Sequence, residues 1–224
     1  MTAPHDDHDH GHDHGDEDWP YPHPKQPDLE DGPVSEHMIM TEAVAELLID
    51  KDIFSAGELR EMLESIDSKS PAEGARMVAR AWTDPDFKAR MLDDVNAAAE
   101  EIGIDAGTIP IRVMENTALV HNVIVCTLCS CYPRLLIGLP PDWYKSRNYR
   151  TRMVREPRAV LAEFGTEISD DVEVRVHDST ADLRYMVLPM RPDGADGLDE
   201  DSLAALVTRD SMIGVSVLKP DNQK

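Results

Sequence analysis

The residues best suited to chemistry are the three cysteines, which all lie within a stretch of six residues. Cys126, Cys129 and Cys131 stand in the run CTLCSC. Two cysteines three positions apart can bind one metal from a turn, and the third reaches the same ion only if the loop wraps tightly around it. That geometry also points the backbone amide nitrogens of Ser130 and Cys131 at the ion. Thiolate and amidate donors are strongly anionic, which favours trivalent cobalt or iron over zinc.

Spacing alone leaves other interpretations of these cysteines open. A zinc knuckle would need a fourth ligand, for which His121 and His177 are candidates, although each is more typical of a packing or surface histidine. Three buried thiols without a metal, or a redox site, are the remaining options. An odd number of cysteines so close together does not form a secreted disulfide framework. The spacing therefore favours a metal site.

The composition excludes several classes of protein. The chain has 224 residues, with 44 acidic and 22 basic side chains and a formal net charge of −22. Such a charge repels phosphate backbones, so we expect no nucleic-acid partner. No window approaches the roughly 18 uninterrupted apolar residues of a membrane-spanning helix, and the acidic N-terminus lacks the pattern of a secretory signal. We therefore expect a cytoplasmic protein that contacts no membrane.

Residues 1–33 differ in composition from the rest of the chain. Histidines alternate with aspartate and glycine, a proline-rich stretch follows, and aliphatic side chains are almost absent. Such a segment cannot offset the entropy of ordering itself, so we expect a disordered tail. Histidine-rich tracts can bind divalent metals through imidazole nitrogens. The candidate tail ligands are His8, His10, His12 and His14.

The elements that must position the cysteines begin with a helical region at residues 34–106. Apolar residues recur at three- and four-residue spacing over residues 38–48, and residues 55–58 and 70–73 have the composition of capping boxes. A further helix begins after Asp84. We expect three or four helices with polar outer faces, which form an arm.

The pattern changes after residue 107, where runs of β-branched residues and apolar–polar alternation predict strands. These strands are expected at residues 109–114, 120–125, 172–176, 183–188 and 212–218. Helices are expected at residues 141–158, where basic side chains cluster, and at residues 199–209. A salt-bridged helix face is the default interpretation of that basic cluster. Residues 107–219 therefore form an α and β domain, and the cysteine run directly follows the strand at residues 120–125.

The cysteine run and its flanks resemble a known family. Residues 125–131, with the sequence VCTLCSC, resemble the metal-claw motif of nitrile hydratase α subunits. Four further blocks resemble that family in the same order, at residues 138–146, 154–158, 163–168 and 208–215. The resemblance extends from residue 38 to residue 217 and leaves out the acidic tail.

This resemblance implies a cobalt-type α subunit, a lyase that hydrates nitriles to amides at a non-corrin Co(III) centre. In the family, Cys126, Cys129 and Cys131 supply sulfur, and the backbone amides of Ser130 and Cys131 complete five protein ligands. Cys129 is implied to be a cysteine sulfinic acid and Cys131 a cysteine sulfenic acid, with Cys131 and Ser130 as the catalytic residues. Thr127 resembles the cobalt class, whereas the Fe(III) class usually has serine at this position.

The resemblance also implies partners and a fold. The α subunit works with a nitrile hydratase β subunit, as a heterodimer or heterotetramer, and the arginines of that partner hydrogen-bond the oxidised sulfurs. A metal-loading activator protein and a small-molecule nitrile are the other implied partners. The implied fold is α+β, with an N-terminal helical arm at residues 34–106 that contacts the partner. A four-layer α-β-β-α domain with mixed sheets follows at residues 107–219.

A sister family provides a second enzyme hypothesis. Arg134 stands where nitrile hydratases usually have tryptophan, and there it resembles the cobalt-bearing γ subunit of thiocyanate hydrolase, as do residues 146–150. That enzyme converts thiocyanate to carbonyl sulfide and ammonia. Residues 138–141 and 154–157 look more like nitrile hydratase. A third hypothesis is a non-catalytic metal-binding or storage subunit, for which deletion of residues 1–33 would abolish the metal content. Both enzyme hypotheses predict that the metal bound to the three cysteines is retained.

Overall fold

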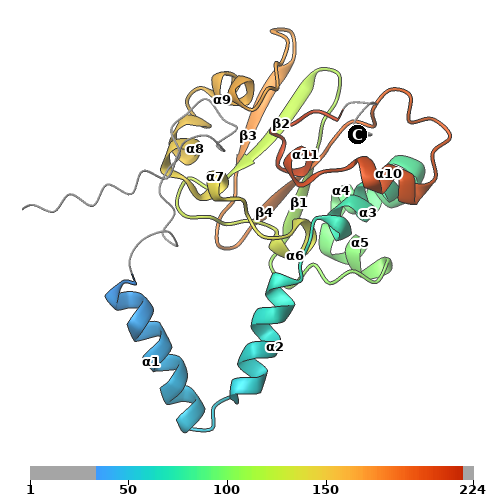
Figure 1. The fold of residues 1–224 in the computed structure, drawn as a ribbon. Coiled ribbons are helices and arrows are strands. Elements are labelled where there is room, and N and C mark those ends of the chain that lie inside the picture. The colour runs from blue at the N-terminus through green and yellow to red at the C-terminus, as the bar shows by residue number, and fades with distance from the viewer. Residues whose placement is uncertain (1–33, 219–224) are drawn as a thin grey trace, which may run out of the picture.

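Two short parallel sheets form the centre of the computed structural model, which describes residues 34–218 (Figure 1). The strands are β1 (Ile111–Glu115), β2 (Val120–Val125), β3 (Glu173–Asp178) and β4 (Arg184–Leu188). Within the described residues, β1 pairs with β4 and β2 pairs with β3, both in parallel. Our expectation of mixed sheets is wrong for these pairs. Each strand reaches its partner through a long connection that contains helices, and so runs in the same direction.

The four expected strands before residue 190 are confirmed, with bounds that differ by no more than two residues. β2 is the most buried of them, because all its residues from His121 to Val125 are buried. Burial on both faces is typical of parallel strands covered by helices, and the two polar residues of this strand, His121 and Asn122, are buried with hydrogen-bond partners. The strand that precedes the cysteines is therefore part of the rigid core.

Helices cover the strands from two sides (Figure 1). On one side, α3, α4 and α5 pack near β1, and α10 packs on α3. On the other side, α7, α8 and α9 follow one another, and α9 contacts β3. No helix among residues 34–218 is long and apolar enough to cross a membrane. These covering helices are α3 (Ala72–Thr83), α4 (Pro85–Asp93), α5 (Val95–Glu101), α7 (Asp142–Lys145), α8 (Arg147–Arg152), α9 (Pro157–Glu163) and α10 (Glu200–Leu206).

The first two helices, α1 (Glu36–Asp50) and α2 (Ala56–Asp67), extend away from this body as an open pair (Figure 1). Neither helix contains a buried residue in the described chain. The capping box predicted at Ser55 is present, because Ser55 Oγ accepts the Glu58 amide and the Glu58 carboxylate accepts the Ser55 amide. Apolar side chains nevertheless remain exposed on the pair, among them Met38, Ile39, Val44, Leu47, Met62 and Leu63.

The helical region expected at residues 34–106 divides into two parts. Only α1 and α2 project, whereas α3 buries Met77, Val78 and Ala81 in the main core. The capping box predicted at residues 70–73 is wrong: Pro71 occupies the N-cap position of α3 without a side-chain cap, and Glu73 pairs with Arg76. Proline lacks the side-chain oxygen that a capping box needs.

The single helix expected at residues 141–158 is also wrong, since this stretch forms three short helices. Ser146 is extended, with ψ of 142°, and its hydroxyl accepts the Tyr149 amide to start α8. Pro157 starts α9, because proline ends the preceding helix and fits the first turn of the next. The basic cluster forms structural contacts: Arg152 pairs with Glu163, and Arg158 donates to three backbone carbonyls.

The last expected strand, at residues 212–218, is wrong. Residues Arg209–Ile213 form helix α11, which begins at a reciprocal Thr208–Ser211 cap and ends at Gly214. Gly214 has a φ of +92° and lies so close to β2 that a Cβ atom would meet the Asn122 carbonyl oxygen at 2.1 Å. The His121 Nε2–H donates to the Gly214 carbonyl at 2.7 Å. A capped helix and a left-handed glycine thus replace the strand and hold the C-terminal segment on β2.

We expect Gly214→Ala to lower the free energy of unfolding by about 3 kcal/mol or more, because positive φ and backbone overlap add together. Gly165→Ala is the matched control: Gly165 also has positive φ, at +77°, but a Cβ there meets nothing within 4 Å. It should cost only about 1–2 kcal/mol. Denaturant unfolding of both variants measures the difference, and equal losses would contradict this account of the contact between α11 and β2.

Candidate metal centre

The cysteine run leaves the carboxyl end of β2 and forms an exposed loop. Cys126 is fully buried at the end of the strand, Cys129 is exposed and Cys131 is half-buried. The loop then returns to the body at Tyr132 and enters the short helix α6 (Arg134–Ile137). A rigid strand therefore fixes the first thiol, and the loop must bring the other two to it.

The three sulfur atoms do come together. Cys126 Sγ lies 3.5 Å from Cys129 Sγ, and Cys129 Sγ lies 3.2 Å from Cys131 Sγ. All three lie within 4.8 Å of one another, and they form the one such group of possible metal ligands within residues 34–218. With metal–sulfur bonds of about 2.3 Å, two sulfurs lie about 3.3 Å apart at a right angle and about 3.8 Å apart at the tetrahedral angle. The donor set thus fits one ion with closely spaced sulfur ligands.

The backbone of the loop also turns towards this group. The Cys129 amide donates to Cys126 Sγ at 3.2 Å. A hydrogen bond from the Cys131 thiol is the largest cause of the lowered pKa of Cys129, and the Ser130 and Cys131 amides contribute as well. Burial, followed by the contact with Cys129, raises the pKa of Cys131 to about 12. Cys129 is therefore the first of the pair to ionise, and the amides of Ser130 and Cys131 face its sulfur.

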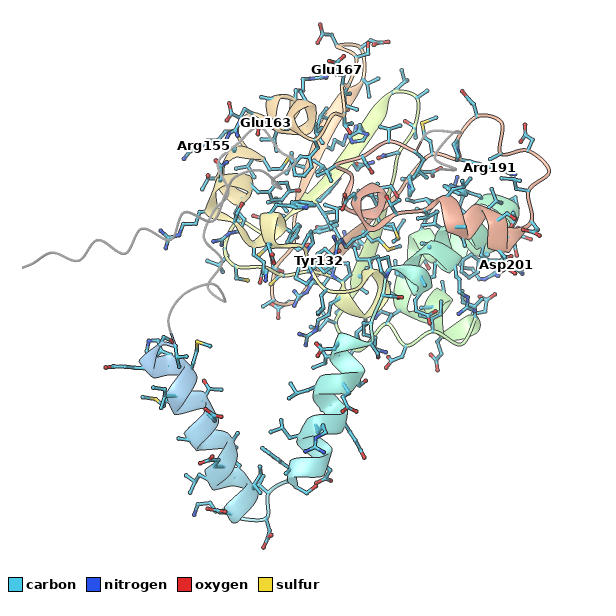
Figure 2. The ribbon with its side chains drawn as sticks, viewed as in Figure 1. Tyr132, Arg155, Glu163, Glu167, Arg191 and Asp201 are labelled. Carbon is cyan, nitrogen blue, oxygen red and sulfur yellow. The ribbon has the colours of Figure 1, made fainter. Side chains whose placement is uncertain are left out.

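Buried tyrosines support the loop from behind. The Tyr144 hydroxyl donates to the Cys131 carbonyl at 2.9 Å, and the Tyr149 hydroxyl donates to the Ile124 carbonyl at 2.7 Å. Tyr132, labelled in Figure 2, packs its ring against Tyr144 with centroids 5.0 Å apart. Burial raises the pKa of all three hydroxyl groups, which keeps them protonated as donors. The sequence carries a signal for these residues that we did not use, since Trp143, Tyr144 and Tyr149 follow Tyr132 within eighteen positions of the last cysteine.

A carboxylate holds the first residue of the loop. Asp178 accepts the Thr127 amide at 2.9 Å and the Thr127 hydroxyl at 2.6 Å. Asp178 is the last residue of β3 and lies opposite Val125 in the parallel register. The sequence alone does not reveal this contact, because only the pairing of β2 with β3 brings Asp178 to Thr127.

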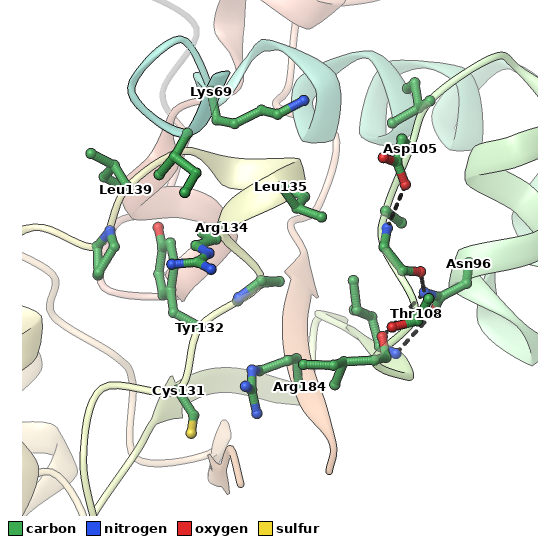
Figure 3. A pocket seen from close by; sticks show the side chains of 18 of the residues that line it. Lys69, Asn96, Asp105, Thr108, Cys131, Tyr132, Arg134, Leu135, Leu139 and Arg184 are labelled. Carbon is green, nitrogen blue, oxygen red and sulfur yellow. Dashed lines mark hydrogen bonds between the residues drawn. The ribbon is translucent and has the colours of Figure 1, made fainter. Parts of the chain in front are cut away.

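A large open cavity of about 2040 Å³ lies beside the loop and includes Cys129, Ser130 and Cys131 in its lining. Figure 3 shows the Arg184 side chain pointing towards Cys131, with Arg134 and Lys69 further along the same cavity. Its basic lining residues are Lys69, Arg134, Lys145, Arg184 and Arg209. Side chains of both charges thus line the cavity, and Arg184 is the cation that points towards the sulfur cluster.

The histidines considered as zinc ligands lie elsewhere. His121 is buried against the Gly214 carbonyl, and His177 Nε2 donates to Asn122 Oδ1 at 2.8 Å. Burial lowers the pKa of both imidazoles, so both are held neutral by packing. A zinc knuckle completed by either histidine is therefore wrong. The candidate tail ligands His8, His10, His12 and His14 lie outside the described residues.

The chain is similar to known proteins along most of its length. The model of the family described as nitrile hydratase, alpha chain, matches residues 35–216. The chain is 51% identical over 178 residues to the low-molecular weight cobalt-containing nitrile hydratase subunit alpha of Rhodococcus rhodochrous, covering 78% of this chain and 86% of that protein. It is also 44% identical over 199 residues to the thiocyanate hydrolase subunit gamma of Thiobacillus thioparus, covering 84% of this chain and 82% of the relative.

A solved structure supports the same relationship. A recombinant thiocyanate hydrolase comprising partially modified cobalt centres superposes with a TM-score of 0.78 at 44% sequence identity. The match covers 84% of this chain and 92% of that chain. Both the helical part and the loop after β2 thus have counterparts in a family whose named members include cobalt-containing subunits.

Proposed function

Because this chain belongs to the nitrile hydratase α-chain family, we propose that it is the metal-binding catalytic subunit of a nitrile hydratase. The reaction adds water to a nitrile: oxygen bonds to carbon, and the nitrogen receives two protons to give the amide. The observation that carries this proposal is the group of three cysteine sulfurs within 4.8 Å, in the loop after β2. Cobalt-containing relatives at 51% and 47% identity support it.

The metal we propose is a non-corrin Co(III) ion, with Fe(III) as the alternative. Cys126, Cys129 and Cys131 would supply sulfur, and the amide nitrogens of Ser130 and Cys131 would complete the protein ligands. A bound Co(III) ion supplies Lewis acidity that polarises the nitrile. Thr127, which resembles the cobalt class, and the cobalt named in two relatives support cobalt over iron.

We propose that Cys129 becomes the sulfinic acid and Cys131 the sulfenic acid. Oxidation follows thiolate character and exposure. Cys129 is the exposed member of the three cysteines. Cys131 is half-buried, which supports the lower oxidation state there. Cys126, which is fully buried, would remain a thiolate.

In this proposal the residues of the chain position and deprotonate water. The sulfenate oxygen of Cys131 takes a proton from water as the water oxygen bonds to the nitrile carbon, and one carbon–nitrogen π pair moves to nitrogen and is protonated there. Alternatively, the sulfenate oxygen itself bonds to carbon, and water then attacks the sulfur, which breaks the sulfur–oxygen bond, releases the amide and restores the sulfenate. The Ser130 hydroxyl orients the attacking water by a hydrogen bond. Tyr144 holds the Cys131 carbonyl, so the sulfur is kept in a fixed orientation while the proton moves.

A partner subunit is the second part of the proposal. The relatives are named as subunits. In addition, α1 and α2 expose apolar side chains, and a group of exposed apolar side chains is typical of a surface that binds another protein. We propose that these two helices contact a β subunit, in a heterodimer or heterotetramer, whose arginines contact the oxidised sulfurs. An activator protein would load the metal. We also propose a cytoplasmic location, because a reducing compartment keeps the three thiols free of disulfide bonds until the metal is loaded.

Acidic substitutions on the exposed apolar side chains of α1 should therefore prevent binding to the β subunit. We expect Val44→Asp with Leu47→Asp to abolish co-purification with the β subunit and to leave the melting temperature of the isolated chain within about 2 °C, because both residues are half exposed on a helix without buried residues. Leu198→Asp, an equally apolar-to-charged change on the body, is the control. Unchanged assembly of the arm variant would contradict this role.

A specific observation favours thiocyanate hydrolysis as the second candidate function. Arg134 lines the cavity beside the cysteines, where a cation would attract anionic thiocyanate (Figure 3). The products would be carbonyl sulfide and ammonia. The 44% identity to a thiocyanate hydrolase subunit gives this alternative support close to that of the first.

Substrate assays on the cobalt-loaded complex distinguish the two. We expect hydration of a small aliphatic nitrile, lost by about 100-fold or more in Cys131→Ala, because a positioned base or nucleophile is removed. Arg134→Trp should abolish any thiocyanate turnover, whereas Arg155→Trp, on an arginine that does not line the cavity, should not. Turnover of thiocyanate alone by the parent complex would replace the first function with the second.

We also propose the four-layer arrangement for the body. The β1–β4 and β2–β3 sheets would be the inner layers, and the helices on the two sides would be the outer layers (Figure 1). A crystal structure in which all four strands join one sheet would contradict it.

A further inference from the structure

The end of β3 lies beside the start of the cysteine loop because of how the strands pair. Val125 lies opposite Asp178 in the parallel register, so both strands leave the sheet at the same edge. The pairing continues one step further, since the Ser179 amide donates to the Val125 carbonyl at 2.7 Å. Ser179 is buried, as is Cys126. The position of Asp178 relative to the first cysteine is therefore set by a rigid, buried part of the molecule.

From this position Asp178 makes two hydrogen bonds to a single residue of the loop. One carboxylate oxygen accepts the Thr127 amide at 2.9 Å, and the other accepts the Thr127 hydroxyl at 2.6 Å. Because both oxygens are engaged, the pair fixes the peptide plane after Cys126 and the side-chain rotamer of Thr127. Hydrogen bonds to an ionised carboxylate are among the stronger ones that proteins make.

The far end of the loop has its own support in the Tyr144 hydroxyl, which donates to the Cys131 carbonyl at 2.9 Å. Between the two contacts, residues 128–130 are exposed, and Leu128 is 88% exposed. A loop of this kind has many conformations, and only a few of them bring three sulfurs within 4.8 Å. A contact that fixes Thr127 reduces this conformational freedom at the start of the loop, where the backbone leaves β2.

We propose that Asp178 is a positioning residue for the metal centre, acting through Thr127 and contacting no ligand atom itself. This inference depends on the proposed function, because it assumes that the three cysteines bind cobalt. It also gives Thr127 a physical role: its hydroxyl is the donor that engages the second carboxylate oxygen. Serine retains that donor, whereas valine has the shape of threonine without it.

The test uses the cobalt-loaded complex with its partner subunit. The variants are Asp178→Ala, Asp178→Asn, Thr127→Val, Thr127→Ser and the double variant Asp178→Ala with Thr127→Val. The readouts are the cobalt retained per chain during challenge with a chelator, and the thiolate-to-metal absorption band. Asp199→Ala is the matched control, because Asp199 is also a carboxylate that accepts a backbone amide, from Ser202 at 2.8 Å, at the start of α10. Melting temperatures report folding of every variant.

We expect Asp178→Ala and Thr127→Val each to release cobalt about tenfold faster or more, and to shift the absorption band. The double variant should be no worse than Asp178→Ala alone, since both changes remove one contact. Asp178→Asn, which keeps an acceptor and the size of the side chain, should lie between the parent and Asp178→Ala. Thr127→Ser should match the parent, and Asp199→Ala should retain cobalt even if its melting temperature falls.

Two results would overturn the inference. In the first, Asp178→Ala retains cobalt and the parent spectrum. In the second, the losses in the double variant are additive, which means that Asp178 and Thr127 act independently. If Asp178→Ala does not fold, parent-like cobalt release by both Asp178→Asn and Thr127→Val overturns it equally. A parent complex that binds no cobalt would instead remove the proposed function, and this inference with it.

Discussion

The parallel pairing of β2 with β3 is the constraint on which the metal centre depends. It brings together two segments that are more than fifty residues apart in the sequence. Cys126 follows the last residue of β2, and Asp178 is the last residue of β3, so the two residues lie at the same end of the sheet. Because β2 is buried along almost its whole length, the first thiol has a fixed position before any metal binds. The exposed remainder of the loop then needs only to be directed back towards that thiol.

Several neighbouring elements hold β2 and the cysteine loop in place by hydrogen bonds. Helix α11 ends at Gly214, whose carbonyl accepts a hydrogen bond from His121 on β2. Tyr149 donates to the Ile124 carbonyl on the same strand, and Tyr144 donates to the end of the loop. Burial keeps these three donors neutral, so they add no charge beneath the loop. The positive side chains lie on the open side of the loop, in the cavity lining.

Local patterns in the sequence predict some of this structure well. The β-branched residues of β2 and the alternation in β3 and β4 predict the strands, and the spacing of the three cysteines predicts that their sulfur atoms come together. Other features depend on contacts distant in sequence. The capped turn at Thr208 and the close approach of Gly214 to Asn122 convert an expected strand into α11. Asp178 could not be found either, because strand register, which the sequence does not state, brings it to Thr127.

We propose that the loop after β2 holds one cobalt ion between oxidised cysteines. The most direct test is the mass of the tryptic peptide spanning residues 113–134, taken from the complex together with its cobalt content; this peptide contains all three cysteines and no internal lysine or arginine. We expect one cobalt per chain and a stable gain of about 32 Da on Cys129, which corresponds to a sulfinic acid. An unmodified peptide from a fully metal-loaded complex would contradict it and indicate a plain thiolate site.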